Sequence, residues 1–181
     1  MSGVTTTPSA TALTTNQDLD PVRLRQAFGM FPSGVVAVGA AVDGELVGLA
    51  ASSFTSVSLD PPLVSFSIAR TSKTWPDLRR AVRFGLTVLA DHHGEACRQL
   101  AGPPAERFDD IPVSVTAEGA VVLDEGLAHF DCSLYREVEA GDHVIILLRV
   151  HGVGYDGADP VPGSPLVFHR SMFGSVSAFG G

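Results

Sequence analysis

The 181-residue sequence predicts a mainly β protein with peripheral α-helices, built on an antiparallel barrel. About seven apolar or alternating segments follow one another at hairpin spacing, which is typical of antiparallel strands. Asp43-Gly44 and Ala140-Gly141 mark turns too short for the crossover that parallel strands need. GxGxxG occurs only as GVGYDG at 152–157, where a strand and not a helix is the next predicted element, and GxxxxGK[ST] does not occur, so a Rossmann domain and a P-loop are not supported.

The folded part is predicted to begin with a helix. Residues 1–19 are rich in Thr, Ser and Ala and lack the basic and apolar regions of a signal peptide, which predicts a disordered lead-in. Asp20 is a helix N-cap and Pro21 suits the first helical position. The helix should end at Phe31, because the residue before Pro32 avoids helical dihedrals. Residues 20–181 are therefore predicted to form one domain.

The remaining elements are read from apolar periodicity. Val64, Phe66 and Ile68 alternate with small residues, which predicts a strand with one core face and one small polar face. Further strands are predicted at 35–42, 45–54, 84–89, 113–116, 120–123, 130–135, 143–155 and 165–169. Helices are predicted at 75–82 and 92–100, the first with Pro76 in its first turn.

Composition limits the partners. Only 18% of residues are charged, below the roughly 25% of typical domains, which favours an apolar surface covered by a partner subunit. A net charge of -8 argues against nucleic acid and anionic membranes as partners. No apolar run approaches the roughly 20 residues of a membrane span. Cys97 and Cys132 are interpreted as buried thiols, and a cytoplasmic location is predicted.

The segment from Gly48 to Thr74 carries ten hydroxyl side chains in an apolar frame and ends in Arg70-Thr71-Ser72-Lys73-Thr74. Hydroxyls, backbone N–H groups at a helix start and nearby cations are what a phosphate ester binds. The alternative interpretation is that these hydroxyls only cap the following helix. The segment thus indicates a phosphorylated ligand without excluding a purely structural role.

The histidines do not form a catalytic set. His92 and His93 are interpreted as surface residues, and His129 and His151 as structural ones. His169-Arg170 could clamp a phosphate or a nicotinamide ribose, or end a strand. No nucleophile with a base, no pair of catalytic acids and no metal-ligand cluster is visible, so a cofactor is expected to carry the chemistry.

Six segments together resemble the flavin reductase family, the reductase components of two-component flavin-dependent monooxygenases. They are FPSGVVAVGA, GLAASSFTSVSLDPPLVSFSIARTSKTW, FGLTVLA, RFDD, FDCSLYREVEAGDHVIILLRV and PLVFHRSMFG. Their order and spacing fit from Pro21 to Ser175. The run ASSFxSVSLxPPLV with a downstream GDH is the most specific part of the match.

This resemblance implies an FMN-binding split β-barrel that binds FAD or FMN, uses NADH and forms a homodimer with the flavin near the interface. Hydride would pass directly from NADH to flavin without an acid or base residue, and reduced flavin would diffuse to a separate oxygenase. The alternative is a non-catalytic flavin-binding or electron-carrier protein on the same barrel. An oxidase of the pyridoxamine-phosphate type would need a further cationic site that the sequence does not offer.

The resemblance also assigns ligand-binding residues, with no metal site among them. Phe173 stands where the family frequently has Tyr, which leaves the nicotinamide preference open. The flavin set is Ser33, Gly34, Ala51, Ser52, Ser53, Phe54, Ser67, Arg70, Ser72, Lys73 and Thr74. The nicotinamide set is His143, His169, Arg170, Phe173 and Gly174.

Overall fold

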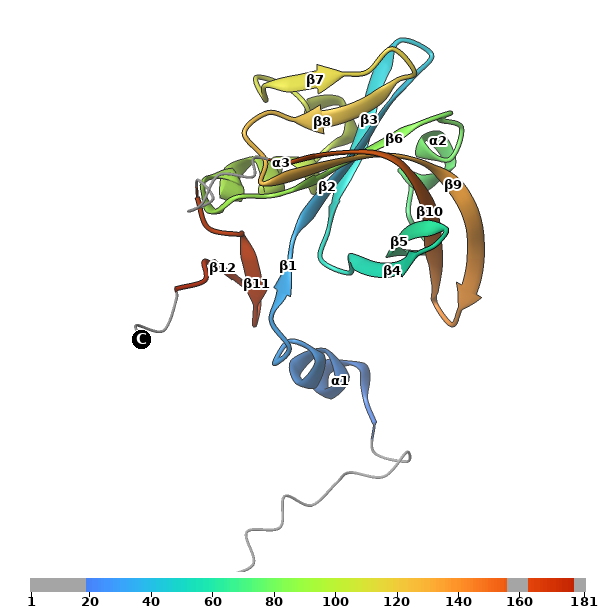
Figure 1. Cartoon of the computed structure of the whole chain (residues 1–181). Coiled ribbons are helices and arrows are strands. Elements are labelled where there is room, and N and C mark those ends of the chain that lie inside the picture. The colour runs from blue at the N-terminus through green and yellow to red at the C-terminus, as the bar shows by residue number, and fades with distance from the viewer. Residues whose placement is uncertain (1–18, 156–162, 178–181) are drawn as a thin grey trace, which may run out of the picture.

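A computed structural model describes residues 19–155 and 163–177, so all but the last residue of the predicted lead-in at 1–19 lies outside the described residues. The described chain is mainly β, and all its strand pairs are antiparallel, as predicted (Figure 1). The strands are β1(Ser33–Gly34), β2(Val36–Val42), β3(Glu45–Ala51), β4(Thr55–Leu59), β5(Pro62–Ala69), β6(Phe84–Val88), β7(Val113–Val115), β8(Ala120–Leu123), β9(Ala128–Ala140), β10(His143–Tyr155), β11(Val167–His169) and β12(Met172–Gly174). The helices are α1(Pro21–Phe28), α2(Trp75–Leu78) and α3(Gly94–Leu100), with short 3-10 turns η2(Asp91–His93) and η3(Pro104–Glu106).

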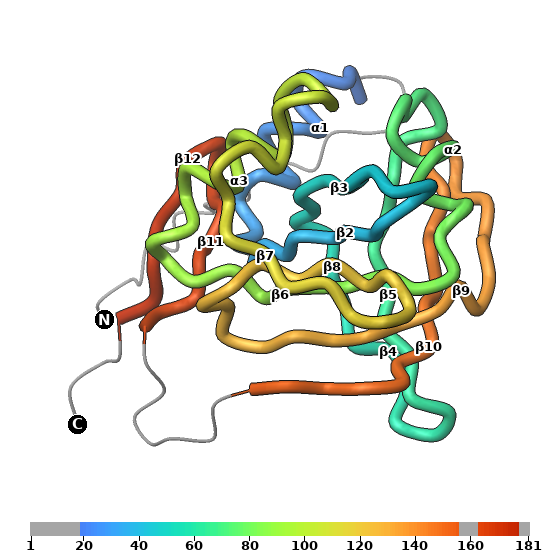
Figure 2. The backbone as a smooth tube through the Cα atoms, turned by 90° about the horizontal axis from the view of Figure 1, so that it is seen from above, coloured from blue at the N-terminus to red at the C-terminus, as the bar shows by residue number. Residues whose placement is uncertain are grey.

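The large sheet has the order β4-β5-β10-β9-β6-β2-β8-β7, and β3 pairs with β2. The long strands β9 and β10 bend, because register shifts interrupt their ladder between Leu147 and Leu148 and between Val150 and Gly152. As a result β9 pairs with β6 through one half and β10 pairs with β5 through the other. Figure 2 shows the strands curving around a central space.

Two apolar cores fill the body. The first contains Val64, Phe66 and Ile68, the predicted core face of β5, together with Phe84 and Ile146. The second packs α3 against β2 and the end of β6, and contains the buried residues Val35, Ala37, Leu89, Cys97, Leu100, Leu123 and Leu166. At Gly85 a side chain would collide with the backbone of Val121, so glycine lets β8 lie close over β6.

Several boundaries differ from the predictions. Asp20 caps α1 as predicted, since its carboxylate accepts hydrogen bonds from the backbone N–H groups of Val22 and Arg23. However, α1 ends at Phe28, where Gly29 forms the cap, rather than at Phe31. The helix predicted at 75–82 spans only Trp75–Leu78. Strand β4 was not predicted, because its alternation is limited to Val57 and Leu59, both of which are exposed and mark no core face.

Helix α1 lies apart from the body, whereas the small sheet β1-β11-β12 packs against it through Phe168 and Phe173 on the second core (Figure 1). None of the residues of α1 is buried. Its apolar side chains and those that follow it remain largely exposed, as Phe28 (70%) and Phe31 (77%) show. In the part of the chain that the structure describes, no helix has the length and apolar character needed to cross a membrane.

Candidate functional site

A cleft of about 430 Å³ opens where the end of β3, the end of β5, the start of β10 and the C-terminal end of α3 meet. Its volume lies within the range of roughly 300–1,000 Å³ that small-ligand sites occupy. Seven of the predicted ligand residues line it: Ala51, Ser52, Ser53, Ser67, Ser72, Thr74 and His143. Segments distant in sequence therefore meet at one site, as the resemblance implied.

The loop that follows β3 is fixed to β5 by one serine. Ser53 accepts a hydrogen bond from the backbone N–H of Ser67 (2.9 Å) and donates to the backbone oxygen of the same residue (3.2 Å). Phe54 packs against Phe130, with ring centroids 5.9 Å apart. These contacts anchor the loop on both sides, so its backbone and the exposed Ser52 hydroxyl lie along the cleft.

The end of β5 leads into α2 through a hydroxyl-rich turn. The Ser72 hydroxyl accepts hydrogen bonds from the backbone N–H groups of Thr74 (3.3 Å) and Trp75 (3.2 Å). The capping interpretation is therefore confirmed for Ser72. A hydroxyl that accepts at both lone pairs still has its proton to donate, so capping and ligand binding are compatible. Lys73 is exposed beside it.

Arg107 is a cleft residue that the sequence analysis did not single out. Its Nε donates to the Gly102 carbonyl (3.0 Å), and its Nη1 donates to the Gly48 carbonyl (2.8 Å) and the Thr74 hydroxyl (2.6 Å). These bonds use three of the five guanidinium protons and leave those on Nη2 for a ligand. Burial lowers the pKa of Arg107, and a bound anion would offset that cost.

His143 faces the cleft from the start of β10. Its Nδ1 lies 2.7 Å from Oδ1 of the adjacent Asp142. The hydrogen bond with His143, and the charge of that histidine, lower the pKa of the Asp142 carboxyl. An ionised Asp142 holds the proton on Nδ1 and leaves Nε2 available to a ligand.

The other predicted flavin residues lie outside this cleft within one chain. Arg70 forms an ion pair with Glu139 (3.8 Å) at the tip of the β9–β10 hairpin. Ser33 and Gly34 form β1, and they pair with Phe168 and Val167 of β11. Neither observation tests their proposed roles, because both segments lie at exposed edges of the molecule.

The predicted nicotinamide set is divided. His143 is in the cleft, whereas His169, Arg170, Phe173 and Gly174 lie on or beside the β11–β12 hairpin. The Phe173 ring contacts Phe168 (centroids 5.5 Å apart) and lies 5.1 Å beneath the guanidinium carbon of Arg98. A phenylalanine is therefore well suited to this partly apolar position.

The remaining histidines and cysteines have structural contacts. His93 is buried, not exposed as predicted: its Nδ1 accepts from the Ala90 N–H (3.1 Å) and its Nε2 donates to the Asp124 carbonyl (3.1 Å). His129 bonds the Leu123 carbonyl (2.8 Å), which supports its structural interpretation. Both cysteines are free and buried, and burial raises the pKa of Cys132 to about 12. Over residues 19–155 and 163–177 no cluster of metal-ligating side chains occurs.

Comparison with known families decides the family of this chain. Residues 28–177 match the family described as "Flavin reductase like domain". The chain belongs to this family. The recognition made from the six sequence segments is thus confirmed, and the match spans the described part of the fold from the end of α1 to the end of the small sheet.

Individual relatives agree with the family match. The chain is 36% identical over 161 residues to a flavin reductase of Pseudomonas putida, covering 88% of this chain and 92% of the relative. It is 32% identical to the reductase subunit HsaB of a flavin-dependent monooxygenase from Rhodococcus jostii (strain RHA1), covering 87% and 79%. The NADH:FAD oxidoreductase SgcE6 of Streptomyces globisporus C-1027, solved with NAD and FAD fragments, is 31% identical with a TM-score of 0.80, covering 92% and 97%.

Proposed function

We propose that this protein is an NADH-dependent flavin reductase that reduces FAD or FMN and releases the reduced flavin to a separate monooxygenase component. The observation that carries the proposal is the cleft in which the loop at 51–54, the hydroxyls of β5 and of the turn before α2, and His143 converge. Family membership and the names of the relatives support the same activity.

The donor set of the cleft fits a flavin. Backbone groups of the loop at 51–54 face the isoalloxazine edge in this proposal, and Ser53 holds that loop in place. Ser72, Lys73 and Thr74 hold the ribityl phosphate, together with the free Nη2 protons of Arg107. Hydroxyls and two cations around one anion satisfy the phosphate oxygens without a glycine-rich loop.

His143 orients the nicotinamide in this arrangement, through the Nε2 atom that Asp142 leaves available. Flavin supplies the redox chemistry by accepting a hydride from NADH. The protein contributes orientation, because holding reacting atoms at about 3–3.5 Å replaces a bimolecular encounter by a local one. No side chain has to donate or remove a proton at the reacting carbon, which is why an acid–base pair is not needed.

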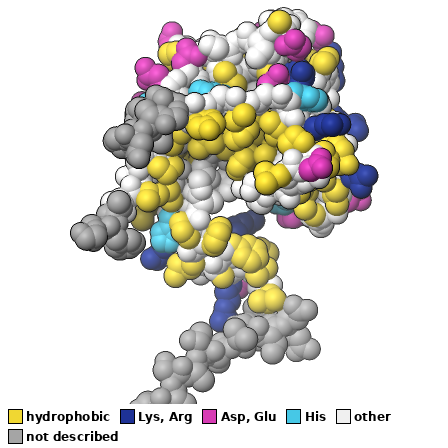
Figure 3. All heavy atoms as spheres, in the orientation of Figure 1, with side chains coloured by type: hydrophobic (Ala, Val, Ile, Leu, Met, Phe, Trp, Pro, Cys, Tyr) yellow, Lys and Arg dark blue, Asp and Glu magenta, His cyan; other side chains and the backbone are white. Residues whose placement is uncertain are grey.

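An antiparallel split β-barrel of the FMN-binding type and a homodimer complete the proposal. Helix α1 exposes Val22 (60%), Phe28 (70%) and Met30 (60%), and Phe31 (77%) follows it. Figure 3 shows apolar side chains gathered over the α1 region below the body, and an apolar band on the body above it. A second copy covering this face would bury them, as the low charged fraction also suggests.

The remaining expectations are proposals of the same kind. We propose that residues 20–181 form a single reductase domain after the lead-in. The flavin and NADH residues on β1, β11 and β12 would meet a cleft only once two subunits assemble, which accords with a flavin near the interface. Two free buried thiols and NADH as electron donor accord with the cytoplasm as the location.

The deciding experiment follows NADH oxidation by its absorbance with purified protein and FAD, FMN or no added flavin. Saturable turnover that depends on flavin supports the reductase and ranks the two flavins. Flavin retained through purification without NADH turnover would instead establish the carrier alternative. Absence of both turnover and flavin binding contradicts both functions.

A further inference from the structure

The loop at 101–110, which follows α3, carries Arg107 into the cleft. Arg107 and Phe108 are partly buried, whereas the residues immediately before and after this pair are exposed. The Phe108 ring packs against the second core, and it lies so close over Gly48 of β3 that a side chain at that position would collide with it. The place of Arg107 in the cleft therefore depends on the conformation of a loop that is otherwise largely exposed.

Gln99, in the last turn of α3, holds this loop at two points. Its Nε2 donates to the backbone carbonyl of Glu106 (2.8 Å) and to that of Asp109 (2.6 Å). Both hydrogens of the amide are thereby used, one on each side of the pair formed by Arg107 and Phe108. Gln99 is not among the residues that line the cleft, so it restrains the loop from outside the ligand site.

Arg107 leaves its Nη2 protons for a ligand only while its other nitrogens keep their partners. Its Nε donates within the loop, to the Gly102 carbonyl (3.0 Å). Its Nη1 donates outside the loop, to the Gly48 carbonyl of β3 (2.8 Å) and to the Thr74 hydroxyl before α2 (2.6 Å). A displaced loop breaks the two Nη1 bonds and turns the guanidinium. A loop fixed beforehand also lowers the cost of ordering a long side chain when the ligand binds.

We propose that Gln99 is a positioning residue for the phosphate end of the flavin cleft, and that it acts through the loop at 101–110 on Arg107. The inference rests on the proposed reductase function and adds to it a residue that does not itself touch the ligand. Guanidinium recognition of phosphate depends on direction, because its donors form a rigid planar fork. A positioning role therefore affects ligands that carry the phosphate, whereas a purely structural role affects all flavins alike.

FMN and riboflavin separate these two roles, because they share the ring and the ribityl chain and differ only in the phosphate. The test measures the Kd of each by fluorescence quenching with flavin-free, full-length protein. Gln99→Leu keeps the approximate size of the side chain and removes both donors, so it should raise the Kd of FMN about five- to tenfold. The Kd of riboflavin should change less than about twofold. Equal changes for the two ligands, or an unchanged Kd for FMN, overturn the proposal.

Two further variants serve as a control and as a repeat. Glu95→Leu places the same side chain at an exposed position of the same helix, outside the cleft, and should change neither Kd more than about twofold. Gln99→Glu keeps the shape of the amide side chain but offers no hydrogen to the two carbonyls when ionised, so it should also weaken FMN selectively. Loss of FMN affinity in Glu95→Leu equal to that in Gln99→Leu would mean that any change on α3 disturbs the cleft, which contradicts a specific role for Gln99.

A double-mutant cycle tests whether Gln99 acts through Arg107. In an Arg107→Ala protein there is no guanidinium to position, so adding Gln99→Leu should change the Kd of FMN less than about twofold. The same five- to tenfold increase in both backgrounds would mean that the two residues act independently, and the proposal would be wrong.

Turnover distinguishes failure of this inference from failure of the reductase function. Gln99→Leu should raise the KM for FMN and leave kcat at saturating FMN within about twofold, because Gln99 affects phosphate binding and not hydride transfer. An unmodified protein that shows flavin-dependent NADH oxidation, together with equal responses of FMN and riboflavin to Gln99→Leu, contradicts the positioning role alone. An unmodified protein that neither binds FMN nor oxidises NADH with flavin contradicts both.

Discussion

The flavin cleft and the α1 region are organised differently. The cleft is fixed from within the chain, by the two Ser53–Ser67 bonds, the three bonds of Arg107 and the continuous pairing of β5 with β10. Helix α1 buries none of its residues, and a strained turn joins it to the rest through the Arg170–Gly29 bond. The cleft is ordered by bonds within one chain, whereas α1 exposes apolar side chains that a second subunit would cover.

This difference indicates how binding and assembly are divided. A flavin that arrives and leaves in every cycle needs a cleft that is formed beforehand, because ordering the protein at each arrival would cost affinity. An interface that forms once can leave apolar side chains exposed on the isolated chain. Variants in the two regions should therefore have separable effects.

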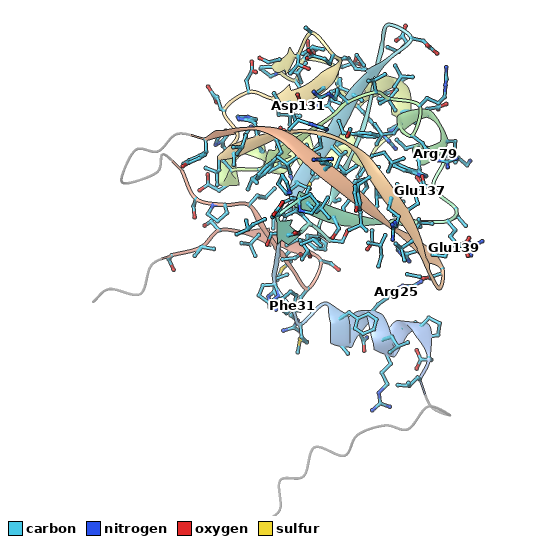
Figure 4. All side chains as sticks on the ribbon, turned by 45° about the vertical axis from the view of Figure 1, so that its right-hand side comes forward. Arg25, Phe31, Arg79, Asp131, Glu137 and Glu139 are labelled. Carbon is cyan, nitrogen blue, oxygen red and sulfur yellow. The ribbon has the colours of Figure 1, made fainter. Side chains whose placement is uncertain are left out.

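The largest expected effect is on assembly. Phe28→Ser combined with Phe31→Ser should weaken dimerisation at least about a hundredfold, since each buried phenylalanine contributes about 1.5–3 kcal/mol. Phe31 projects at the end of α1 in Figure 4. Sedimentation equilibrium measures the change, and the cleft of the single chain should keep flavin binding that is weakened only by the loss of residues from the partner subunit. Val82→Ser, also exposed (77%) but beside α2, is the matched control, and a stable dimer in the double variant would contradict the assigned interface.

A substitution in the cleft should instead weaken flavin binding and leave the dimer intact. Arg107→Ala removes bonds to Gly48, Gly102 and Thr74 and should lower the free energy of unfolding by about 2–3 kcal/mol. Flavin Kd, measured by fluorescence quenching, should rise at least about tenfold, while the dimer persists. Arg107→Lys keeps the charge but not the paired donors of the guanidinium. Its stability and flavin Kd should therefore lie between those of the unmodified protein and Arg107→Ala.

A surface arginine, Arg79, provides the control for the Arg107 prediction. Arg79 forms an exposed ion pair with Glu137 (2.7 Å), so Arg79→Ala should change stability by less than about 1 kcal/mol and leave flavin affinity unaltered. Equal losses in Arg79→Ala and Arg107→Ala would mean that Arg107 has no special place in the cleft. A destabilised Arg107→Ala protein with normal flavin Kd would restrict its role to folding.

Sequence patterns predicted much of this organisation wherever a physical constraint acts on neighbouring residues. Alternation of Val64, Phe66 and Ile68 predicted the core face of β5, because burial on one side of a strand imposes a period of two. Strand β4 escaped prediction because only Val57 and Leu59 follow that period, and both are exposed instead of buried. Arg107 also escaped, since its partners Gly48 and Thr74 lie 59 and 33 residues away and only folding brings them together.

His143 lies in the cleft and is proposed to contact NADH, so its substitution should affect NADH and flavin differently. His143→Ala should raise the KM for NADH about tenfold, as expected for one lost hydrogen bond to a ligand, with less than about twofold change in flavin Kd. Asp142→Asn keeps the imidazole but removes the charge that fixes its Nδ1 proton, so a smaller increase in KM is expected. Steady-state kinetics with flavin titration measures both constants. Equal changes in KM and flavin Kd would place His143 on the flavin instead.

The smallest expected effect is on the pH dependence of stability, through the buried His93. Burial, followed by the charge of His92, lowers the pKa of His93, while the Asp124 carbonyl and Glu125 act in the opposite direction and His129 adds to the lowering. Because the folded protein excludes a proton that the unfolded chain binds below its ordinary pKa of 6.5, stability is complete above that pH and decreases below it. Urea unfolding at about pH 7.5 and 5.5 should show a loss of less than about 1 kcal/mol per unit. His93→Asn retains an acceptor for the Ala90 N–H and should reduce the dependence of the unfolding free energy on pH. The same substitution at the exposed His92 should leave that dependence unchanged. Equal dependence in the unmodified protein and both variants would mean that other groups control the acid sensitivity.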